Sequence, residues 1–304
     1  MSIENLRNIA IIAHVDHGKT TLVDKLLSQS GTLDRKDVGS ERLMDSNDQE
    51  KERGITILAK NTAINWNDYR INIVDTPGHA DFGGEVERVL SMVDSVLLLV
   101  DAVDGPMPQT RFVTSKAFEQ GLRPIVVINK VDRPGARPDW VMDQVFDLFD
   151  NLGATDEQLD FPVIYASALN GIAGLDVDDM ADDMTPLYEM IVNDVPAPKV
   201  DVDGPFQMQV SALAYDSYVG VIGVGRITRG QLKPGQQVIV KTSEGSERKG
   251  KVLNVKGYLG LEQIETQLAT AGDIVCINGI DGLGISDTLC DPVNIEAMQA
   301  LNVD

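Results

Sequence analysis

The stretch Ala13-His-Val-Asp-His-Gly-Lys-Thr20 decides the fold of this chain. It follows an apolar run at residues 9–13 that has the length of a strand, and it opens a helical pattern at residues 19–29. A turn of this kind between a strand and a helix is a phosphate loop, whose backbone N–H groups and helix N-terminus can cradle phosphates. Ala13 stands where the usual pattern has its first glycine, and this departure reduces the number of phosphate-loop families that the chain can belong to. The stretch therefore predicts an α/β nucleotide-binding domain.

Four more short segments follow in an order and at a spacing that fit one domain. They are Arg53-Gly-Ile-Thr56, Asp75-Thr-Pro-Gly-His79, Asn129-Lys-Val-Asp132 and Ser167-Ala-Leu169. The third identifies the base, because the carboxylate of Asp132 can accept hydrogen bonds from both N1–H and the 2-amino group of guanine. Adenine offers neither donor pattern. Together with the phosphate loop, these segments predict a site for GTP and GDP.

The phosphate loop supplies most of the residues expected around the phosphates and Mg²⁺. Lys19 is expected to reach the β- and γ-phosphates, where it acts in binding and in catalysis, and the Thr20 hydroxyl is expected to ligate Mg²⁺. The other expected nucleotide contacts of this loop are Asp16, His17, Gly18 and Thr21. Thr56 is the expected second hydroxyl ligand of Mg²⁺, and Asp75 is expected to hold the ion through water.

The segment that ends at His79 contains the residue expected to orient the attacking water. All three histidines lie in nucleotide motifs, but only His79 directly follows Asp-Thr-Pro-Gly, where a hydrolytic water must be placed. His14 and His17 are expected to shape the loop. The Gly78 amide is expected to face the γ-phosphate, and the polar residues 31–54 are expected to order around Mg²⁺ and that phosphate.

The base pocket is expected to form from the last two segments. Asn129 should tie the base-binding segment to the phosphate loop, and Lys130 should lay its apolar stem across the base plane. The segment Ser167, Ala168 and Leu169 completes recognition. The Ala168 amide is expected to donate to guanine O6. Adenine would leave that amide and the Asp132 carboxylate unpaired, at a cost of about 2–4 kcal/mol in a desolvated pocket.

Residues 8–195 alternate strand-length apolar runs with helical patterns. The expected strands are 9–13, 71–74, 95–101, 125–129 and 163–166, and the expected helices are 19–29, 109–120, 140–151 and 183–193. The strands are apolar on both faces, which is typical of parallel strands buried under helices. The pattern predicts a doubly wound, mostly parallel α/β sheet of the P-loop type, with the motifs at its carboxyl edge.

The segment Pro196-Ala-Pro198 marks a change of composition, and domains at residues 1–196 and 197–304 are expected. The β-type runs beyond it are 206–213, 219–227, 237–240, 251–255 and 274–277. Glycines separate these runs, as turns and bulges require. Short strands at this spacing predict a small all-β barrel.

The composition fits a soluble two-domain protein. With 304 residues the chain is too long for one ordinary core. The hydrophobic share is 43%, and the mean hydropathy is −0.08. The apolar runs are strand-sized and no basic-then-apolar leader opens the chain, so neither membrane binding nor secretion is expected. Cys276 and Cys290 are expected to be buried thiols, and the expected location is the cytoplasm.

The net charge of −21 is unusual for a protein that meets RNA. A chain that held RNA by phosphate contacts alone should be basic. Much of the excess lies between Asp176 and Asp203, which is interpreted as a solvated helix start and linker. A divalent-ion site is the alternative, but no glycine-turned loop with calcium-ligand spacing is present there.

The five segments, followed by a β-barrel, resemble those of the translational GTPases such as the elongation factors. Four further segments match one branch of that family: Asp45-Ser-Asn-Asp, Ile55-Thr-Ile-Leu-Ala-Lys-Asn-Thr, Pro106-Met-Pro-Gln-Thr-Arg-Phe-Val and Asn129-Lys-Val-Asp-Arg-Pro-Gly-Ala-Arg-Pro. The resemblance implies GTP hydrolysis stimulated by the ribosome (its rRNA and proteins), with roles in ribosome assembly and adaptation to stress, notably cold. It also implies an apolar gate of Val15 and Ile55 beside His79, and a monovalent cation near Asp16.

Proteins of that branch continue for several more domains, so this chain is expected to be an N-terminal fragment, monomeric and with weak ribosome affinity. Two alternatives remain open. One is a guanine-nucleotide-dependent binding module with negligible turnover. The other is a different enzyme on the same scaffold, such as the GTPase subunit of a sulfate adenylyltransferase. Stimulation of turnover by ribosomes in the intact protein would separate all three.

Overall fold

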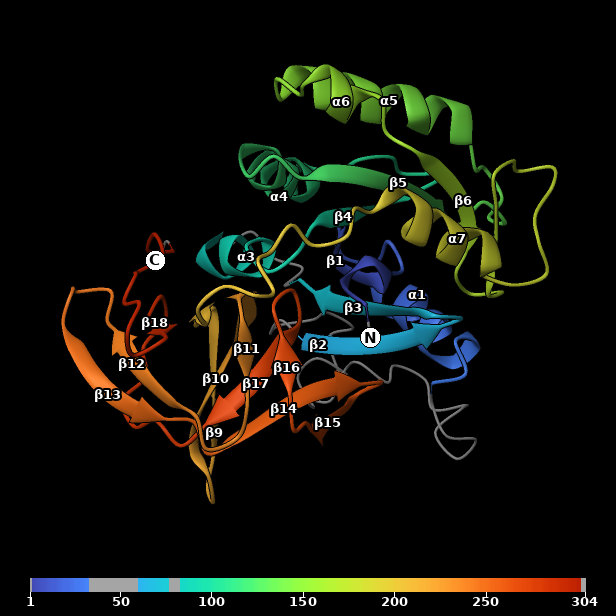
Figure 1. Cartoon of the computed structure of the whole chain (residues 1–304). Coiled ribbons are helices and arrows are strands. Elements are labelled where there is room, and N and C mark those ends of the chain that lie inside the picture. Colours follow the sequence, from blue (N-terminus) through green and yellow to red (C-terminus); the bar gives the residue numbers. More distant parts are fainter. Residues whose placement is uncertain (1, 33–59, 77–82, 302–304) are drawn as a thin grey trace. The chain divides into compact units, whose positions relative to one another are not determined.

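The computed structural model describes residues 2–32, 60–76 and 83–301 of the chain (Figure 1). Its contacts divide the chain into two compact units. The α/β unit is Arg7–Ala197, and the β unit combines Met1–Leu6 with Pro198–Asp304. The short 3-10 helix η1, Ile3–Asn5, therefore groups with the later unit, although the sequence assigned the first residues to the nucleotide-binding domain.

The α/β unit is built on a seven-stranded sheet with the order β2-β3-β1-β4-β5-β6-β7. The strands are β1 Leu6–Ala13, β2 Lys60–Trp66, β3 Tyr69–Asp75, β4 Ser95–Asp101, β5 Arg123–Asn129, β6 Val163–Ser167 and β7 Ile172–Gly174. β1, β4, β5 and β6 run parallel, whereas β2 and β7 join antiparallel at the two edges. The prediction of a mostly parallel sheet is confirmed.

The described helices of this unit lie between its strands along the chain, except for α7, which follows β7. They are α1 Lys19–Gln29, α3 Gly83–Leu90, α4 Pro108–Glu119, α5 Pro138–Asn151, α6 Asp156–Leu159 and α7 Thr185–Asp194. α4, α5 and α7 each carry proline in the first turn, where its missing N–H costs no helical hydrogen bond. The positions of α1, α4, α5 and α7 agree with the sequence pattern, but α3 and the four-residue α6 were not predicted.

The edge strands β2 and β7 were also not predicted, because each depends on its partner. β2 alternates polar and apolar residues weakly and is fixed by its hairpin with β3. Asn67 closes that hairpin with a left-handed φ of 51°, a conformation that asparagine tolerates better than most residues. β7 has only three residues and pairs antiparallel with β6.

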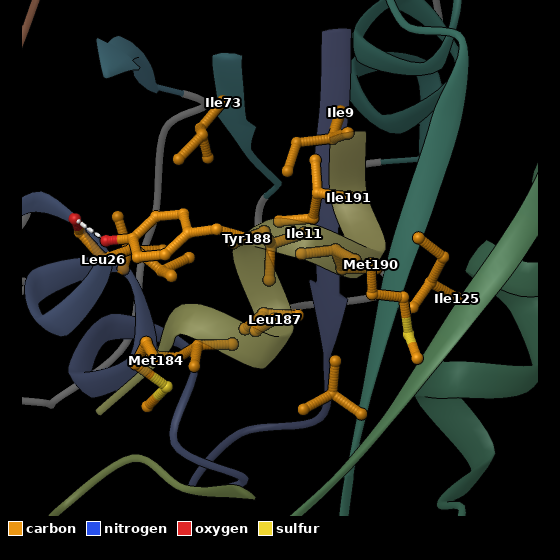
Figure 2. Close-up of a cluster of buried hydrophobic side chains, with 14 of the residues drawn as sticks. Ile9, Ile11, Leu26, Ile73, Ile125, Met184, Leu187, Tyr188, Met190 and Ile191 are labelled. Atoms are coloured by element: carbon orange, nitrogen blue, oxygen red, sulfur yellow. Dashed lines mark hydrogen bonds between the residues drawn. The ribbon is translucent and has the colours of Figure 1, made fainter. Parts of the chain in front are cut away.

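The core of the α/β unit gathers around α7 (Figure 2). Tyr188 is only 2% exposed, and its hydroxyl donates to the carbonyl of Leu26 in α1. Its ring stacks on Trp66, with ring centroids 5.3 Å apart and planes 13° from parallel. Burial, with a smaller contribution from Asp183, raises the pKa of the Tyr188 hydroxyl well above its ordinary value. The contacts hold α7 against α1, the helix that begins at the phosphate loop.

The β unit contains a nine-stranded antiparallel sheet with the order β13-β12-β18-β8-β10-β17-β14-β15, to which β9 adds by pairing with β10. The strands are β8 Gln207–Gln209, β9 Ala212–Asp216, β10 Gly220–Arg229, β12 Gln237–Lys241, β13 Glu247–Lys251, β14 Asn254–Leu259, β15 Glu262–Glu265, β17 Ile274–Asn278 and β18 Thr288–Cys290. β11, Gln231–Leu232, pairs separately with β16, Ala269–Thr270. This is the all-β, barrel-type second domain that the sequence predicts.

Two of the predicted β runs were wrong in their limits. The run at 206–213 is two strands, β8 and β9, because the chain pairs with β18 before the break and only with β10 after it. The run at 251–255 joins the end of β13 to the start of β14, because Leu253 donates to the carbonyl of Asn278 and the chain changes partner there from β12 to β17. Alternation of apolar residues does not record a change of partner.

Two expectations from composition can be compared with the described residues. The Cys276 and Cys290 thiols are both free and buried. Burial raises the pKa of Cys276 to about 11, although the Tyr258 hydroxyl, which is 2.7 Å from its Sγ, acts in the opposite direction. Across the part of the chain that the structure describes, no helix combines the length and the apolar character needed to cross a membrane.

Candidate nucleotide-binding site

The phosphate loop connects the end of β1 to the start of α1 and contains two left-handed residues. Asp16 has a φ of 65° and Gly18, the residue that caps α1, has a φ of 95°. A Cβ atom on Gly18 would lie 2.5 Å from Nδ2 of Asn129. Glycine is therefore required at this position both for the backbone and for the close approach of the base-binding segment.

Lys19 lies under the loop with 8% of its side chain exposed. Its Nζ is 2.7 Å from Oδ1 of Asp75, a fully buried carboxylate at the end of β3, and it also donates to the carbonyl of Thr76. The Thr76 hydroxyl in turn donates to the carbonyl of Ile11 in β1 at 2.7 Å. The structure thus brings together two residues predicted for the phosphates and for Mg²⁺, Lys19 and Asp75.

Asn129 joins the phosphate loop to the base-binding segments. Its Nδ2 donates to the carbonyl of His17 at 2.9 Å, and its Oδ1 accepts from the Ala168 amide at 2.9 Å. The side chain is 1% exposed, so both bonds are shielded from water. One buried amide therefore holds three segments that are far apart in the sequence, as expected for Asn129.

The Ala168 amide has a partner that the sequence analysis did not expect. The sequence assigned this N–H to guanine O6, but in the structure it donates to Asn129. Ser167 is fully buried, and its hydroxyl accepts from Nδ2 of Asn170 at 2.9 Å. Leu169 is 73% exposed, and Asp132 lies exposed in the loop after β5. Of these residues, Asp132 is the one with a polar side chain accessible to a base.

Lys130 connects the base-binding segment to the phosphate loop a second time. Its backbone is left-handed, with a φ of 65°, and its Nζ donates to the carbonyl of Asp16. The same Nζ lies 3.0 Å from Oδ2 of Asp101, at the end of β4. Arg133 reaches that oxygen too, with its Nη1 at 3.1 Å. Asp101 was not predicted as a site residue.

One signal in the sequence could have identified Asp101. It ends the apolar run of β4 at the carboxyl edge of the sheet, and the β4–β5 register places it directly beside Asn129. In parallel sheets this edge is where ligands bind. A carboxylate that follows a buried strand and has no cation near it in the sequence must find one across the sheet, because a buried unpaired charge is costly.

His17 is buried, and its imidazole is harder to protonate than an exposed one. Burial is the largest cause that lowers its pKa below the ordinary value of 6.5, and the nearby His14 lowers it further. Its Nδ1 faces the carbonyl of Leu99 at 3.5 Å, and its ring meets that of His14 edge to face, with centroids 5.2 Å apart. These contacts are those of a residue that shapes the loop.

The remaining predicted residues divide into two groups. Thr20 and Thr21 lie half-buried in the first turn of α1. Thr56, Gly78 and His79 lie outside the described residues, as do Ile55 and most of the segment 31–54. Within the described ranges, no three His, Cys, Asp or Glu side chains gather in a way that could hold a metal ion, and this includes the acidic residues between Asp176 and Asp203.

The residues around the loop fit Mg²⁺ by their chemistry. The Thr20 hydroxyl and the Asp75 carboxylate offer hard oxygen ligands from two neighbouring elements. Mg²⁺ prefers such ligands and usually keeps several waters, binding through one or two carboxylates and the substrate phosphates. A cluster of protein carboxylates is therefore not required at this site.

The family model of the elongation factor Tu GTP binding domain matches residues 4–197, and that of elongation factor Tu domain 2 matches residues 220–290. The large ribosomal subunit assembly factor BipA of Escherichia coli (strain K12) is 77% identical over 302 residues, 99% of this chain and 50% of that protein. The protein of that name from Haemophilus influenzae is 72% identical, over all of this chain and 50% of its own length.

A crystal structure of a Thermus thermophilus protein has the same fold, with a TM-score of 0.72 at 21% identity, covering 96% of this chain and 55% of that one. The chain spans about half the length of the relatives named above. The match to the first family model covers well over half of the chain, including the phosphate loop and both base-binding segments. The chain therefore belongs to the family of the elongation factor Tu GTP binding domain.

Proposed function

We propose that this chain is the GTP-hydrolysing part of a ribosome-associated translational GTPase that acts in assembly of the large ribosomal subunit. The single observation that carries the proposal is the bonding of the guanine-type segments to the phosphate loop through Asn129 and Lys130. A nucleotide whose phosphates lie on the loop would then meet Asp132 with its base. The role in assembly is suggested by relatives that are named for it and are 77% identical.

The residues have distinct proposed roles in hydrolysis. Lys19 and the backbone N–H groups at the start of α1 offset the phosphate charge, and His79 orients the attacking water. Thr20, Thr56 and Asp75 would hold Mg²⁺, which neutralises charge on the β- and γ-phosphate oxygens when bound. The remaining proposed contacts are Asp16, His17, Gly18, Thr21 and Gly78 around the phosphates.

Two finer features also belong to the proposal. Val15 and Ile55 form an apolar gate beside His79, and a monovalent cation binds near Asp16. The Asp16 carbonyl is already bonded to Lys130, so the carboxylate is the atom proposed to face the cation.

Hydrolysis by this chain alone should be slow, on the order of 10⁻⁴ to 10⁻² s⁻¹, because no partner fixes His79 against the water. We also propose that the chain is monomeric and cytoplasmic, and that the whole protein serves adaptation to stress such as cold. Ribosome affinity of the chain should be weak, because its net charge of −21 opposes docking to RNA.

The test compares GTP hydrolysis by this chain and by the full-length protein, each with and without ribosomes. The proposal predicts slow turnover in both alone and strong stimulation of the full-length protein by ribosomes. It also predicts tighter and more salt-dependent ribosome binding by the full-length protein. Guanine-nucleotide binding without hydrolysis under any of these conditions would favour a binding module, and stimulation by a metabolite in place of ribosomes would favour another enzyme on this scaffold.

A further inference from the structure

The carboxylate of Asp101 is the centre of a charged cluster that the hydrolysis reaction does not use. Asp101 is the last residue of β4, and its side chain is fully buried. Oδ1 accepts from the amides of Val103 at 2.7 Å and Asp104 at 3.3 Å. Oδ2 faces two cations, Lys130 and Arg133, at 3.0 and 3.1 Å. Both oxygens are therefore bonded, and the two cations that balance the charge come from the loop after β5.

The ionised form of Asp101 is the stable one. Burial on its own would raise the pKa of the carboxyl group, but hydrogen bonds from the Val103 amide and from Lys130 outweigh it and lower the pKa below its ordinary value. A carboxylate that remains charged when buried needs its partners in place. The cluster is thus a rigid anchor for the groups that it binds.

The two cations flank the residue that is proposed to read the base. Lys130 and Arg133 are the ends of a tight turn, closed by a hydrogen bond of 3.0 Å from the Arg133 amide to the Lys130 carbonyl. Asp132 lies inside this turn and is exposed. Asp101 therefore binds both ends of the turn that contains Asp132 with one oxygen.

The turn needs such an anchor because its backbone is strained at the start. Lys130 has a left-handed φ of 65°, which is unfavourable for a residue with a Cβ. The Nζ of Lys130 also donates to the Asp16 carbonyl, so the same side chain links Asp101, the turn and the phosphate loop. Without the Asp101 charge, Lys130 would keep its hydrogen bond to the Asp16 carbonyl but lose its ion pair. Arg133 would also lose its ion pair with Asp101.

From this geometry we propose that Asp101 is a positioning residue for guanine recognition, fixing the turn Lys130–Arg133 so that Asp132 meets the N1–H and 2-amino edge of the base. The proposal deepens the proposed function and rests on it. In this proposal Asp101 acts indirectly, through its ion pairs with Lys130 and Arg133. Its signature is a loss of the preference for GDP over inosine diphosphate without a matching loss of folding stability.

The experiment measures equilibrium dissociation constants for GDP and for inosine diphosphate, which lacks the 2-amino group that Asp132 reads. One variant is Asp101→Asn, which keeps the shape of the side chain and removes its charge. The other is Arg133→Met, at a position where the native arginine side chain is 47% exposed, so that the substitution should disturb packing little. Glu119→Gln is the matched control, because it removes a carboxylate from an ion pair with Lys116 on α4. Thermal unfolding without nucleotide reports stability separately.

In the wild type, GDP should bind at least tenfold more tightly than inosine diphosphate. Asp101→Asn should weaken GDP at least tenfold and inosine diphosphate much less, so that the ratio falls toward one. Arg133→Met should lower the ratio about threefold, and Glu119→Gln should leave it unchanged. Should Asp101→Asn fail to fold, Arg133→Met decides the matter.

An unchanged ratio in Arg133→Met and in any folded Asp101→Asn protein, or an equal weakening of both nucleotides, would overturn the positioning role. Failure of the wild type itself to bind GDP, or to prefer it, is a different result. It would remove the proposed guanine site before any variant is considered.

Discussion

The close approach of Gly18 and Asn129 predicts that a side chain at position 18 would destabilise the α/β unit. Replacing Gly18 by alanine places a Cβ on a backbone with a φ of 95°, which costs about 1–2 kcal/mol of stability for a left-handed residue. The new atom would also lie 2.5 Å from Asn129 Nδ2, so the Asn129 side chain must move. That movement endangers two buried hydrogen bonds, to His17 and from Ala168, each worth about 1–3 kcal/mol when a buried partner is left unsatisfied.

A double-mutant cycle isolates the contact. Asn129→Ala alone should cost about 2–6 kcal/mol, from the two orphaned groups. Gly18→Ala should cost about 3 kcal/mol or more in the wild type but only the backbone strain, about 1–2 kcal/mol, in the Asn129→Ala background. The two substitutions should therefore be non-additive by at least about 1 kcal/mol.

The assay is urea unfolding without nucleotide, because a bound nucleotide would add its own binding energy. Tryptophan fluorescence reports the α/β unit alone, since the chain has two tryptophans, Trp66 and Trp140, and both lie between Arg7 and Ala197. Equal costs of Gly18→Ala in both backgrounds, within about 0.5 kcal/mol, would refute the claim that Asn129 occupies the space that a Cβ needs.

Four further predictions use separate assays. Asp132→Asn should lose GDP and gain xanthosine diphosphate, since the amide can donate to the 2-oxo group of xanthine; equal GDP affinity before and after would remove Asp132 as the base reader. His79→Ala should leave GTP affinity within a few-fold and abolish most ribosome-stimulated turnover of the full-length protein, whereas full stimulation would assign the water to another group. Tyr188→Phe should cost the α/β unit about 0.5–1.5 kcal/mol in urea unfolding by losing one buried hydrogen bond, and no change would mean that the bond to Leu26 contributes nothing. Folding lowers the pKa of His17, so the unfolded chain takes up this proton first as the pH falls below about 6.5. The free energy of unfolding should therefore decrease below that pH, and it should decrease less in His17→Asn. Identical pH profiles of the two proteins would contradict a buried, neutral His17.

Much of the α/β unit could be predicted because its signals are local. The strand Ser95–Asp101 and the helix Lys19–Gln29 have the limits that their sequence patterns predict, since a continuous apolar run and a glycine-then-lysine helix start are both short-range patterns. The edge strand Lys60–Trp66 was missed because its pairing with Tyr69–Asp75 stabilises it more than its own composition does.

The β unit shows the same distinction. Gly220–Arg229 was found as one long strand, but the break between β8 and β9 was not, because a change of pairing partner leaves no mark on alternation. The first residues of the chain group with this unit through contacts distant in sequence, such as the packing of Ile3 and Leu6 near Gly272. No local pattern predicts such a contact.

Part of the candidate site could be predicted from the motifs, where a motif residue makes the contact that its side chain suggests. Asn129 bonds to the phosphate loop as predicted from its motif, and it also accepts from the Ala168 amide, a bond that the sequence analysis did not expect. Asp101 was missed because its role depends on two cations 29 and 32 residues further along the chain, which meet it only when β4 and β5 lie side by side.

The most direct test of a guanine nucleotide site is competition between nucleotides for this chain. A fluorescent GDP analogue bound with Mg²⁺ should be displaced by GDP and, at concentrations roughly 100-fold or more higher, by ADP, because ADP leaves two charge-assisted hydrogen bonds of Asp132 unmade. ADP and GDP displacing the analogue at equal concentrations would contradict the assignment of this site to guanine.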